Sequence, residues 1–574
     1  VRPQSEWDGL LKQRDPASSA TLEGATRDVC KAAFMLEIGA LKQLLWDEGY
    51  PADGYDRSDY GNTPLHCVAA LYHMSEAFPS SFVFNLLRGQ PSWLSPKLRP
   101  PMPRRMATVV ASDLLSRVDA AAAEAAEWLI AAGAGVNRAN SDNVTPLQAA
   151  AVGGMERVVA ALVAHGAEVE REDERGSSVL LTAGLQGHVG AAAELLRAGA
   201  DSLHRNVFGY GFRDVASEPG PFMPEDAAAR FNITQRAPKA LPAPTEPGED
   251  DWNGGWSRKV LEGYEELDVC DVDMLEASEV TADELFRGYV ARNRPVLIRG
   301  LISDWPAKQV YAMDSLLERF GGMGVHVSGI PYERKFDTNS SHMGVDMSLA
   351  EYLEQVRSHS MLGGTHPWYV FQGYRIPKAS DSASSPVTED IVPVPELIRG
   401  AFHLGVKHAR NKGPHPESLG TKETSKRAEL FVNAQFAVGG RGTGAPMHFH
   451  NTAWNALVYG RKLWFVTPPH HKVMSNSQIL QFAEEELEEL VKSGVHVSRC
   501  VQRQGDVMIV PENWGHGVLN LQDSIAVATE VRFNLFRLAN VPSVVRATDP
   551  RHQAKQQHGA ADQEPPRRPH AARA

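Results

Sequence analysis

Residues 442–469 read GTGAPMHFHNTAWNALVYGRKLWFVTPP, and this stretch decides the fold of the C-terminal half of the chain. A glycine-rich turn is followed by two apolar runs at residues 456–459 and 463–466, which are rich in strand-forming side chains. The pattern therefore predicts a strand, a tight turn and a second strand. His448 and His450 lie two positions apart, so on a strand their side chains point to the same face and can share a metal ion.

A third metal ligand is predicted further along the chain. Residues 505–521 read GDVMIVPENWGHGVLNL, which again indicates strand, turn and strand, with His516 where the turn ends. Imidazoles suit iron, zinc, copper and nickel. We therefore predict that His448, His450 and His516 bind one metal ion. Two ordinary surface histidines are the alternative for the HxH pair taken by itself.

Both stretches, in this order, resemble a Jumonji C domain of the cupin superfamily, the 2-oxoglutarate- and iron(II)-dependent oxygenases. The matching pieces are residues 454–457, 460–462, 468–469, 511–516 and 518–521. The resemblance implies iron(II) and 2-oxoglutarate as cofactors, with His448 as the first metal ligand and His516 as the last. It also implies that Lys462 pairs with the distal carboxylate of 2-oxoglutarate and that Asn455 lies beside this cosubstrate.

The sequence departs from the family pattern at two positions. His450 stands where the family has Asp or Glu, and Ala528 stands where some relatives have Thr. A carboxylate lowers the net charge of an iron(II) centre, whereas a neutral imidazole leaves the centre more positive and changes its metal preference. A three-histidine iron site is chemically possible, and other cupins use one. His450 therefore keeps metal binding open but places ordinary oxygenase turnover in question.

The N-terminal third carries a repeat. The triplet TPL occurs at residues 63–65 and again at residues 145–147, where Thr caps a helix and Pro takes its first position. Thr145 and Ser178 are 33 residues apart (178 − 145), which is the ankyrin period. We predict an ankyrin array rather than a generic stack of helix pairs. Such arrays present a concave surface that binds protein.

Length and charge bound the remaining possibilities. The chain has 574 residues, too many for one compact core, so two or three domains are expected. The net charge of −12 argues against general nucleic-acid affinity. No run is long and apolar enough to span a membrane. We expect the cytoplasm or the nucleus, with the secretory pathway left open because the sequence begins at Val1 and its true start can be missing.

The four cysteines are scattered without CxxC spacing; they are Cys30, Cys67, Cys270 and Cys500. This pattern predicts neither a disulfide framework nor a cysteine-based zinc site. Reduced, buried thiols in a reducing compartment are the expectation.

The predicted fold is an all-α ankyrin solenoid followed by a double-stranded β-helix, the jelly-roll or cupin barrel, with flanking helices. Proline, glycine and acidic residues mark a linker between the two domains, and a polar, modestly basic tail ends the chain. The predicted segments are an N-terminal segment at 1–25, the ankyrin array at 26–216 with an insertion near 80–115, the linker at 217–266, the Jumonji C cupin-like domain at 267–541, and the disordered tail at 542–574.

The leading functional hypothesis is an iron(II)- and 2-oxoglutarate-dependent oxygenase that hydroxylates a protein. Demethylation is the less economical version, because the sequence shows no aromatic cage for methyl-lysine. The ankyrin array would bind the protein substrate or partner, and no catalytic residue is predicted beyond the metal centre. One alternative is a weak or inactive Jumonji C scaffold with a structural His-His-His site. Another is a three-histidine dioxygenase that does not use 2-oxoglutarate, against which Lys462 argues.

Overall fold

The computed structural model describes residues 29–30, 33, 38–47, 50–54, 62–69, 107–109, 112–140, 143–173, 175–216, 253–329, 344–358, 368–375, 385–410, 433–471, 473–475 and 477–531. The predicted N-terminal segment, most of the predicted linker and the predicted tail lie outside these residues. No helix in the described ranges is both long and apolar enough to cross a membrane.

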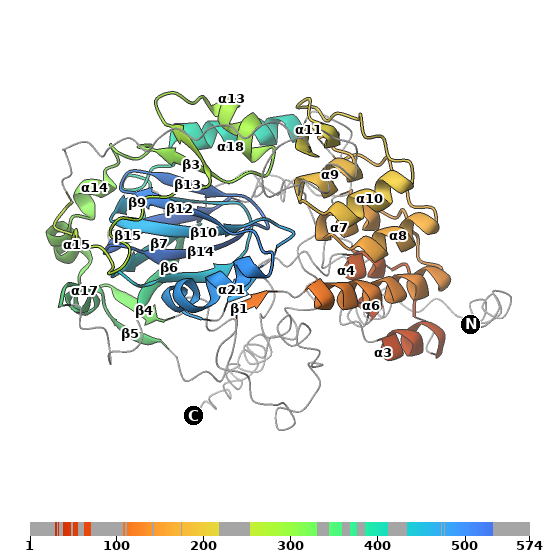
Figure 1. The fold of residues 1–574 in the computed structure, drawn as a ribbon, viewed down its shortest axis with the longest axis horizontal. Coiled ribbons are helices and arrows are strands. Elements are labelled where there is room, and N and C mark those ends of the chain that lie inside the picture. The colour runs from red at the N-terminus through yellow and green to blue at the C-terminus, as the bar shows by residue number, and fades with distance from the viewer. Residues whose placement is uncertain are drawn as a thin grey trace, which may run out of the picture.

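The N-terminal domain is a stack of helices (Figure 1). Its helices are α3 (Ile38–Lys42), the π-helical turn η1 (Gln43–Asp47), α4 (Pro64–Ala69), α6 (Ser112–Ala131), α7 (Pro146–Gly153), α8 (Glu156–Ala164), α9 (Val179–Leu185), α10 (Val189–Arg197) and α11 (Phe212–Ala216). Thr145 caps α7 in a capping box with Gln148, and the hydroxyl of Ser178 accepts a hydrogen bond from the Leu181 amide at 3.2 Å. The predicted ankyrin array is therefore confirmed.

The C-terminal domain contains two large β-sheets. The nine-stranded sheet runs in the order β2 (Asp273–Glu276), β3 (Val296–Arg299), β13 (Val507–Val510), β9 (Ala453–Tyr459), β15 (Ser524–Glu530), β7 (Asn433–Gly439), β6 (Tyr369–Arg375), β4 (Gly324–Ser328) and β5 (Val345–Ser348). The four-stranded sheet runs in the order β12 (Ser498–Arg503), β10 (Arg461–Thr467), β14 (Gly515–Asn520) and β8 (Gly444–His448).

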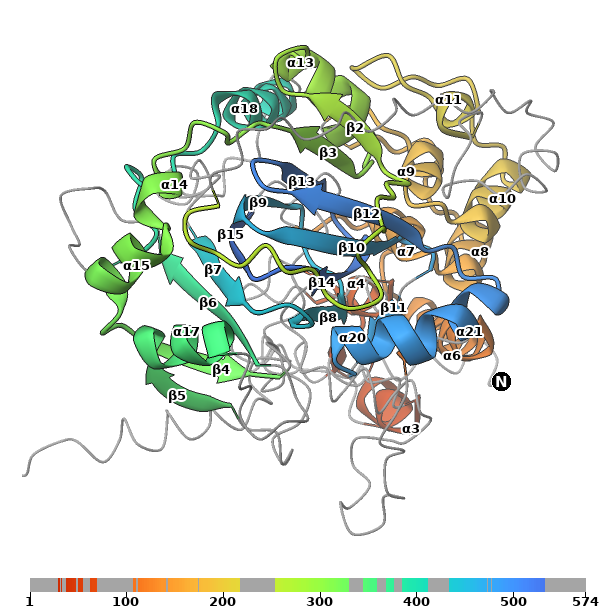
Figure 2. The same cartoon turned by 60° about the vertical axis from the view of Figure 1, so that its left-hand side comes forward.

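Helices flank these sheets, and they are α13 (Ala282–Leu285), η3 (Phe286–Val290), α14 (Ala307–Val310), α15 (Met313–Phe320), α17 (Leu349–Ser358), α18 (Glu396–Arg410), α20 (Ile479–Gln481), η4 (Phe482–Glu486) and α21 (Leu487–Lys492). The run from α20 to α21 lies beside the four-stranded sheet (Figure 2), where Phe482 and Leu490 pack in one cluster with Leu463 and Phe465. This apolar contact covers the outer face of the sheet, so the opposite face is the one that looks into the domain.

The two large sheets pack face to face. Leu297 and Met508 of the nine-stranded sheet share one buried cluster with Trp464, Val466 and Val518 of the four-stranded sheet. The prediction of ankyrin helices followed by a cupin-type β domain is confirmed. Over the described residues, however, the two sheets stay open at their edges and do not close into a barrel.

Gly460 carries the chain from one sheet to the other. β9 ends at Tyr459 in the nine-stranded sheet, and β10 begins at Arg461 in the four-stranded sheet. Gly460 has φ = +96°, and a side chain there would collide with Ser524 and the backbone of Asp523. The predicted tight turn is therefore real, but its two strands face each other across the domain instead of pairing.

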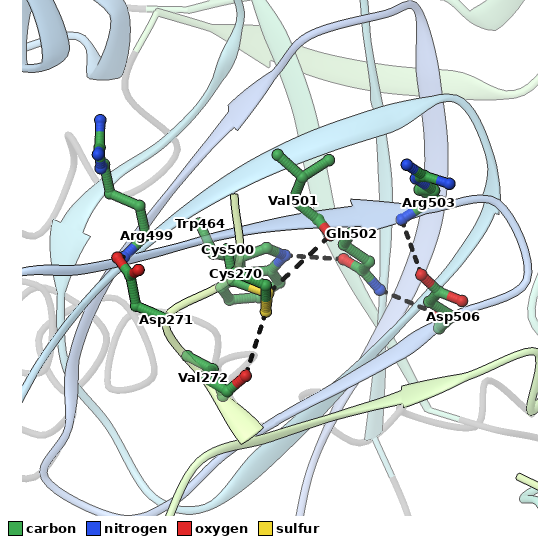
Figure 3. The surroundings of a disulfide bond; sticks show 10 residues. All are labelled: Cys270, Asp271, Val272, Trp464, Arg499, Cys500, Val501, Gln502, Arg503 and Asp506. Atoms are coloured by element: carbon green, nitrogen blue, oxygen red, sulfur yellow. Dashed lines mark hydrogen bonds between the residues drawn. A yellow bond between two sulfur atoms is a disulfide. The ribbon is translucent and has the colours of Figure 1, made fainter. Parts of the chain in front are cut away.

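The prediction that the cysteines form no disulfide is wrong for one pair. Cys270 and Cys500 are bonded, and they belong to an antiparallel bridge that adds the segment before β2 to strand β12 (Figure 3). The two residues are 230 positions apart, so no local spacing in the sequence predicts the bond. Cys30 and Cys67 form no disulfide and are buried, as predicted.

The two domains contact each other directly. Strand β1 (Ala107–Val109), from the predicted ankyrin insertion, pairs antiparallel with β11 (Val473–Ser475), which follows β10. The Tyr210 hydroxyl donates a hydrogen bond to the Arg287 carbonyl at 2.7 Å, and the rings of Phe208 and Phe286 lie 5.0 Å apart. The ankyrin array is thus packed against the β domain.

Candidate metal centre

The three predicted metal-ligating histidines meet on the four-stranded sheet. His448 is the last residue of β8, and His516 is the second residue of β14. These strands are antiparallel neighbours, and His448 and His516 are partners in the register. His450 follows β8 by two residues. All three side chains are buried, with residue exposures of 8%, 8% and 4% for His448, His450 and His516.

The distances between the rings suit one metal ion. One ring nitrogen from each histidine can be chosen so that all three lie within 4.8 Å of one another. The Nε2 atoms of His450 and His516 are 3.1 Å apart. Two nitrogen ligands held about 2.1 Å from an ion at a right angle are themselves about 3 Å apart. The spacing therefore matches two neighbouring ligands of one ion.

The other ring nitrogens are fixed by backbone carbonyls. The Nδ1 atoms of His448, His450 and His516 lie 2.7, 2.6 and 3.0 Å from the carbonyl oxygens of Pro446, Asn451 and Trp514. A carbonyl oxygen can only accept, so each Nδ1 carries the proton and donates. In the neutral rings the lone pairs are then on Nε2, the atoms that face one another. Carbonyl partners of this kind orient an imidazole ring so that its other nitrogen can bind a metal ion.

Electrostatics favour neutral imidazoles at this point. The pKa of His516 lies well below its ordinary range, chiefly because the ring is buried and further because His448 and His450 are close. Two neutral rings with Nε2 atoms 3.1 Å apart present lone pair to lone pair, which is repulsive until a cation lies between them. The donor set thus fits a divalent ion with nitrogen preference, and His450 leaves it without a carboxylate.

Lys462 lies on the inward face of β10. It pairs in register with Gln502 of β12 and Asn520 of β14, and its residue exposure is 1%. Burial lowers the pKa of Lys462 to about 7. No ion pair formed within the described residues includes Lys462. Because none of the described carboxylates pairs with this buried ammonium, an anionic ligand would stabilise its charged form.

The distance from Lys462 to the histidines follows from the register. Val466 is the register partner of His516, and Lys462 is four residues before Val466 on the same face of β10. Four residues of strand span roughly 13 Å. A lysine side chain and a five-carbon dicarboxylate together can bridge this separation.

Asn455 faces the same interior from the opposite sheet. It lies on β9 opposite Met508 and Ala528, and its residue exposure is 8%. Its side-chain carbonyl oxygen is buried and has no hydrogen-bond partner in the described part of the chain. A buried acceptor without a donor is costly, so this atom is available to a ligand.

Gln502 connects the two sheets, and the sequence analysis did not single it out. Its side-chain nitrogen donates to the carbonyls of Asn455 and Asp506 at 2.9 and 3.0 Å, and its oxygen accepts from the Trp464 indole at 2.8 Å (Figure 3). It is fully buried. Gln502 lies in the mixed strand SRCVQR, where a glutamine is unremarkable, so the local pattern does not reveal these partners.

Comparisons with known proteins agree with this architecture. Residues 282–531 match the model of the cupin-like domain, and residues 118–206 match a model of ankyrin repeats in three copies. The human JmjC domain-containing protein 8 is 27% identical over 294 residues, which cover 50% of this chain and 95% of that protein.

Two further relatives carry names that state an activity. The Arabidopsis thaliana arginine-specific demethylase JMJ20 is 23% identical over 285 residues, covering 45% of this chain and 56% of the relative. The Danio rerio 2-oxoglutarate and iron-dependent oxygenase JMJD4 is 26% identical over 102 residues, covering 16% of this chain and 24% of the relative.

Proposed function

We propose that this protein is an iron(II)- and 2-oxoglutarate-dependent oxygenase that acts on another protein. The chain carries an ankyrin array followed by a cupin-like domain, and its relatives are JmjC domain-containing proteins. The observation that carries the proposal is the set of three buried imidazoles whose Nδ1 atoms are held by carbonyls and whose Nε2 atoms face one another. The names of two relatives, an oxygenase and a demethylase, support the same reaction class.

In this proposal His448, His450 and His516 hold the metal. Lys462 binds the distal carboxylate of 2-oxoglutarate as a charge-assisted pair between the sheets, and the unpaired oxygen of Asn455 accepts a hydrogen bond from a water beside the cosubstrate. When bound, iron(II) and 2-oxoglutarate supply the oxidation of a substrate C–H to C–OH by dioxygen, with release of succinate and carbon dioxide. The protein contributes orientation and a dry interior.

Hydroxylation is the proposed outcome, and demethylation is its special case. A hydroxylated N-methyl carbon breaks down to formaldehyde, whereas a hydroxylated side-chain carbon keeps the added oxygen. The ankyrin array is the proposed site of protein binding, in line with the general use of such surfaces. Peptide mass increase without formaldehyde would support hydroxylation, and formaldehyde release would favour demethylation.

The test is binding and turnover on protein purified without oxygen. Iron(II), zinc and nickel are added in turn, and 2-oxoglutarate affinity and carbon dioxide release are measured. We expect one iron per chain, saturable 2-oxoglutarate binding, and the loss of iron binding in His516→Ala. Failure of every metal to promote 2-oxoglutarate binding would overturn the proposal.

A second candidate function rests on His450. Because the centre has no carboxylate, a bound ion keeps its full charge, and a Jumonji C scaffold with a structural metal is the alternative. This alternative predicts stoichiometric metal without 2-oxoglutarate decarboxylation in the presence of any protein substrate.

The compartment is also proposed from the structure. A disulfide that joins residues 230 positions apart persists in oxidising surroundings and is rare in the cytosol. We therefore favour the secretory alternative over the cytoplasm or nucleus. Non-reducing peptide mapping of the protein from its native source checks this, and a free Cys500 would contradict it.

A further inference from the structure

One turn holds two of the three histidines in place. The Asn513 amide donates to the His450 carbonyl at 3.1 Å, and the Trp514 carbonyl accepts from Nδ1 of His516 at 3.0 Å. Asn513 itself has φ = +68°, a conformation that non-glycine residues adopt at a cost and keep only when neighbours support it. The shape of the turn at residues 511–514 therefore sets where His450 and His516 point.

The ankyrin array reaches this turn through Gln186. This residue follows α9 and is fully buried. Its side-chain oxygen accepts a hydrogen bond from the Asn513 side-chain amide at 3.5 Å, across 327 residues of sequence. Its backbone also lies against the ring of His470, in the loop that follows β10. One ankyrin residue thus contacts two loops of the β domain.

We propose that Gln186 is a positioning residue of the metal centre. This role rests on the proposed function. It means that the ankyrin array supports the metal centre in addition to offering a surface for partners. Gln186 steadies Asn513 from outside, Asn513 keeps the turn in its left-handed conformation, and the turn keeps the Nε2 atoms of His450 and His516 aimed at one point. Partners that support metal ligands are known to tune metal affinity by 10- to 100-fold, and Gln186 acts one step further out.

The test measures cobalt(II) binding to the full-length metal-free protein. Cobalt(II) is chosen because its visible absorption reports ligand geometry. Gln186→Met keeps the length and removes the hydrogen bond, and we expect it to weaken cobalt(II) binding about threefold to tenfold and to change the spectrum. Asn513→Gly removes the same hydrogen bond but tolerates φ = +68°, so it should weaken binding similarly.

A double-mutant cycle isolates the contact. Since both changes remove one interaction, the double variant Gln186→Met/Asn513→Gly should bind cobalt(II) about as weakly as either single variant. Gln148→Met is the matched control, because Gln148 is a buried ankyrin glutamine whose partner is Thr145 of its own repeat. It should lower the melting temperature without changing the cobalt(II) dissociation constant or the spectrum.

The outcomes separate this role from the proposed function. If the unaltered chain binds cobalt(II) and Gln186→Met binds it within twofold with the same spectrum, the positioning role is wrong and the metal centre stands. If the two single changes add fully, Gln186 and Asn513 act independently, which also overturns the role. If the unaltered chain binds neither cobalt(II) nor iron(II), the proposed function fails, and the role fails with it.

Discussion

The disulfide should contribute a large part of the stability of the β domain. Cys270–Cys500 closes a loop of 230 residues, and the chain-entropy relation gives about 5 kcal/mol for a loop of this length, while removal of native disulfides typically costs about 2–5 kcal/mol. We expect Cys270→Ser/Cys500→Ser to lower the free energy of unfolding by about 3–5 kcal/mol. At about 2–4 °C per kcal/mol for a domain of this size, the melting temperature should fall by about 10 °C.

The strand contact itself should survive in this variant. The Val501 amide donates to the Val269 carbonyl at 2.7 Å. The Asp271 amide donates to the Arg499 carbonyl at 2.7 Å, and the Arg499 amide donates to the Asp271 carboxylate at 2.8 Å. Asp271 and Arg499 lie next to the disulfide in Figure 3. Each such hydrogen bond contributes roughly 1 kcal/mol. The loss should therefore come from the unfolded state, and amide exchange at Val501 should remain slow.

Calorimetry with and without reductant is the assay. Reductant should lower the melting temperature of the unaltered protein to that of the double variant and leave the variant unchanged. Cys30→Ala/Cys67→Ala is the control, because these thiols form no disulfide, and its reductant response should equal that of the unaltered protein. A double variant that melts within 2 °C of the unaltered protein would refute the entropic reasoning.

Four further predictions concern the metal centre. Lys462→Met should abolish 2-oxoglutarate binding and leave the iron(II) dissociation constant, measured without cosubstrate, within about twofold. In the unaltered protein, 2-oxoglutarate affinity should fall as pH rises above about 7, because a neutral Lys462 amine binds a carboxylate poorly. In the unfolded chain this lysine keeps its proton up to about pH 10.4, so the contribution of Lys462 to the free energy of unfolding should increase between about pH 7 and about pH 10.4. Unfolding of Lys462→Met and of the unaltered protein at several pH values measures this contribution. His450→Asp should increase 2-oxoglutarate decarboxylation, measured as carbon dioxide release, and unchanged release would argue against a turnover limit set by the third imidazole. Chelation of a loaded protein should lower the stability by about 2.7 kcal/mol where free metal had been 100 times its dissociation constant, and His516→Ala should show no such response.

The sequence was informative where neighbours in the chain are neighbours in space. The two histidines of the HxH motif, the helix cap at Thr145 and the 33-residue ankyrin period are local features. The structure contains the cap and brings the two histidines to one site, although strand β8 ends at His448 and His450 lies beyond it. The pattern of residues 347–353 indicates a helix, and helix α17 is present, but it begins two residues later, at Leu349, because Met347 pairs with Val325 in a strand. Sheet pairing overrides helix propensity there.

Contacts between distant segments left no readable pattern. Cys270 and Cys500 are 230 residues apart, and Gln186 and Asn513 are 327 residues apart. Taken alone, each of these residues is an ordinary cysteine, glutamine or asparagine. Its structural role depends on a contact that forms only when the chain is folded. The candidate site was thus predictable as a list of metal ligands, while the groups that orient those ligands were not.

The net charge of the metal centre bears on both functional hypotheses, the active oxygenase and the scaffold with a structural metal. In a site with two histidines and one carboxylate, the formal charges of that carboxylate, a divalent ion, a 2-oxoglutarate dianion and a protonated lysine sum to zero. With His450 in place of the carboxylate, the same buried set carries one net positive charge. A cationic interior binds dianions more tightly, and by linkage the dianion and the metal strengthen each other's binding. Succinate is also a dianion, so the replacement that aids cosubstrate binding also retains the product. Under the proposed function, His450 would therefore act against turnover through slow product release and would leave metal binding and cosubstrate binding in place.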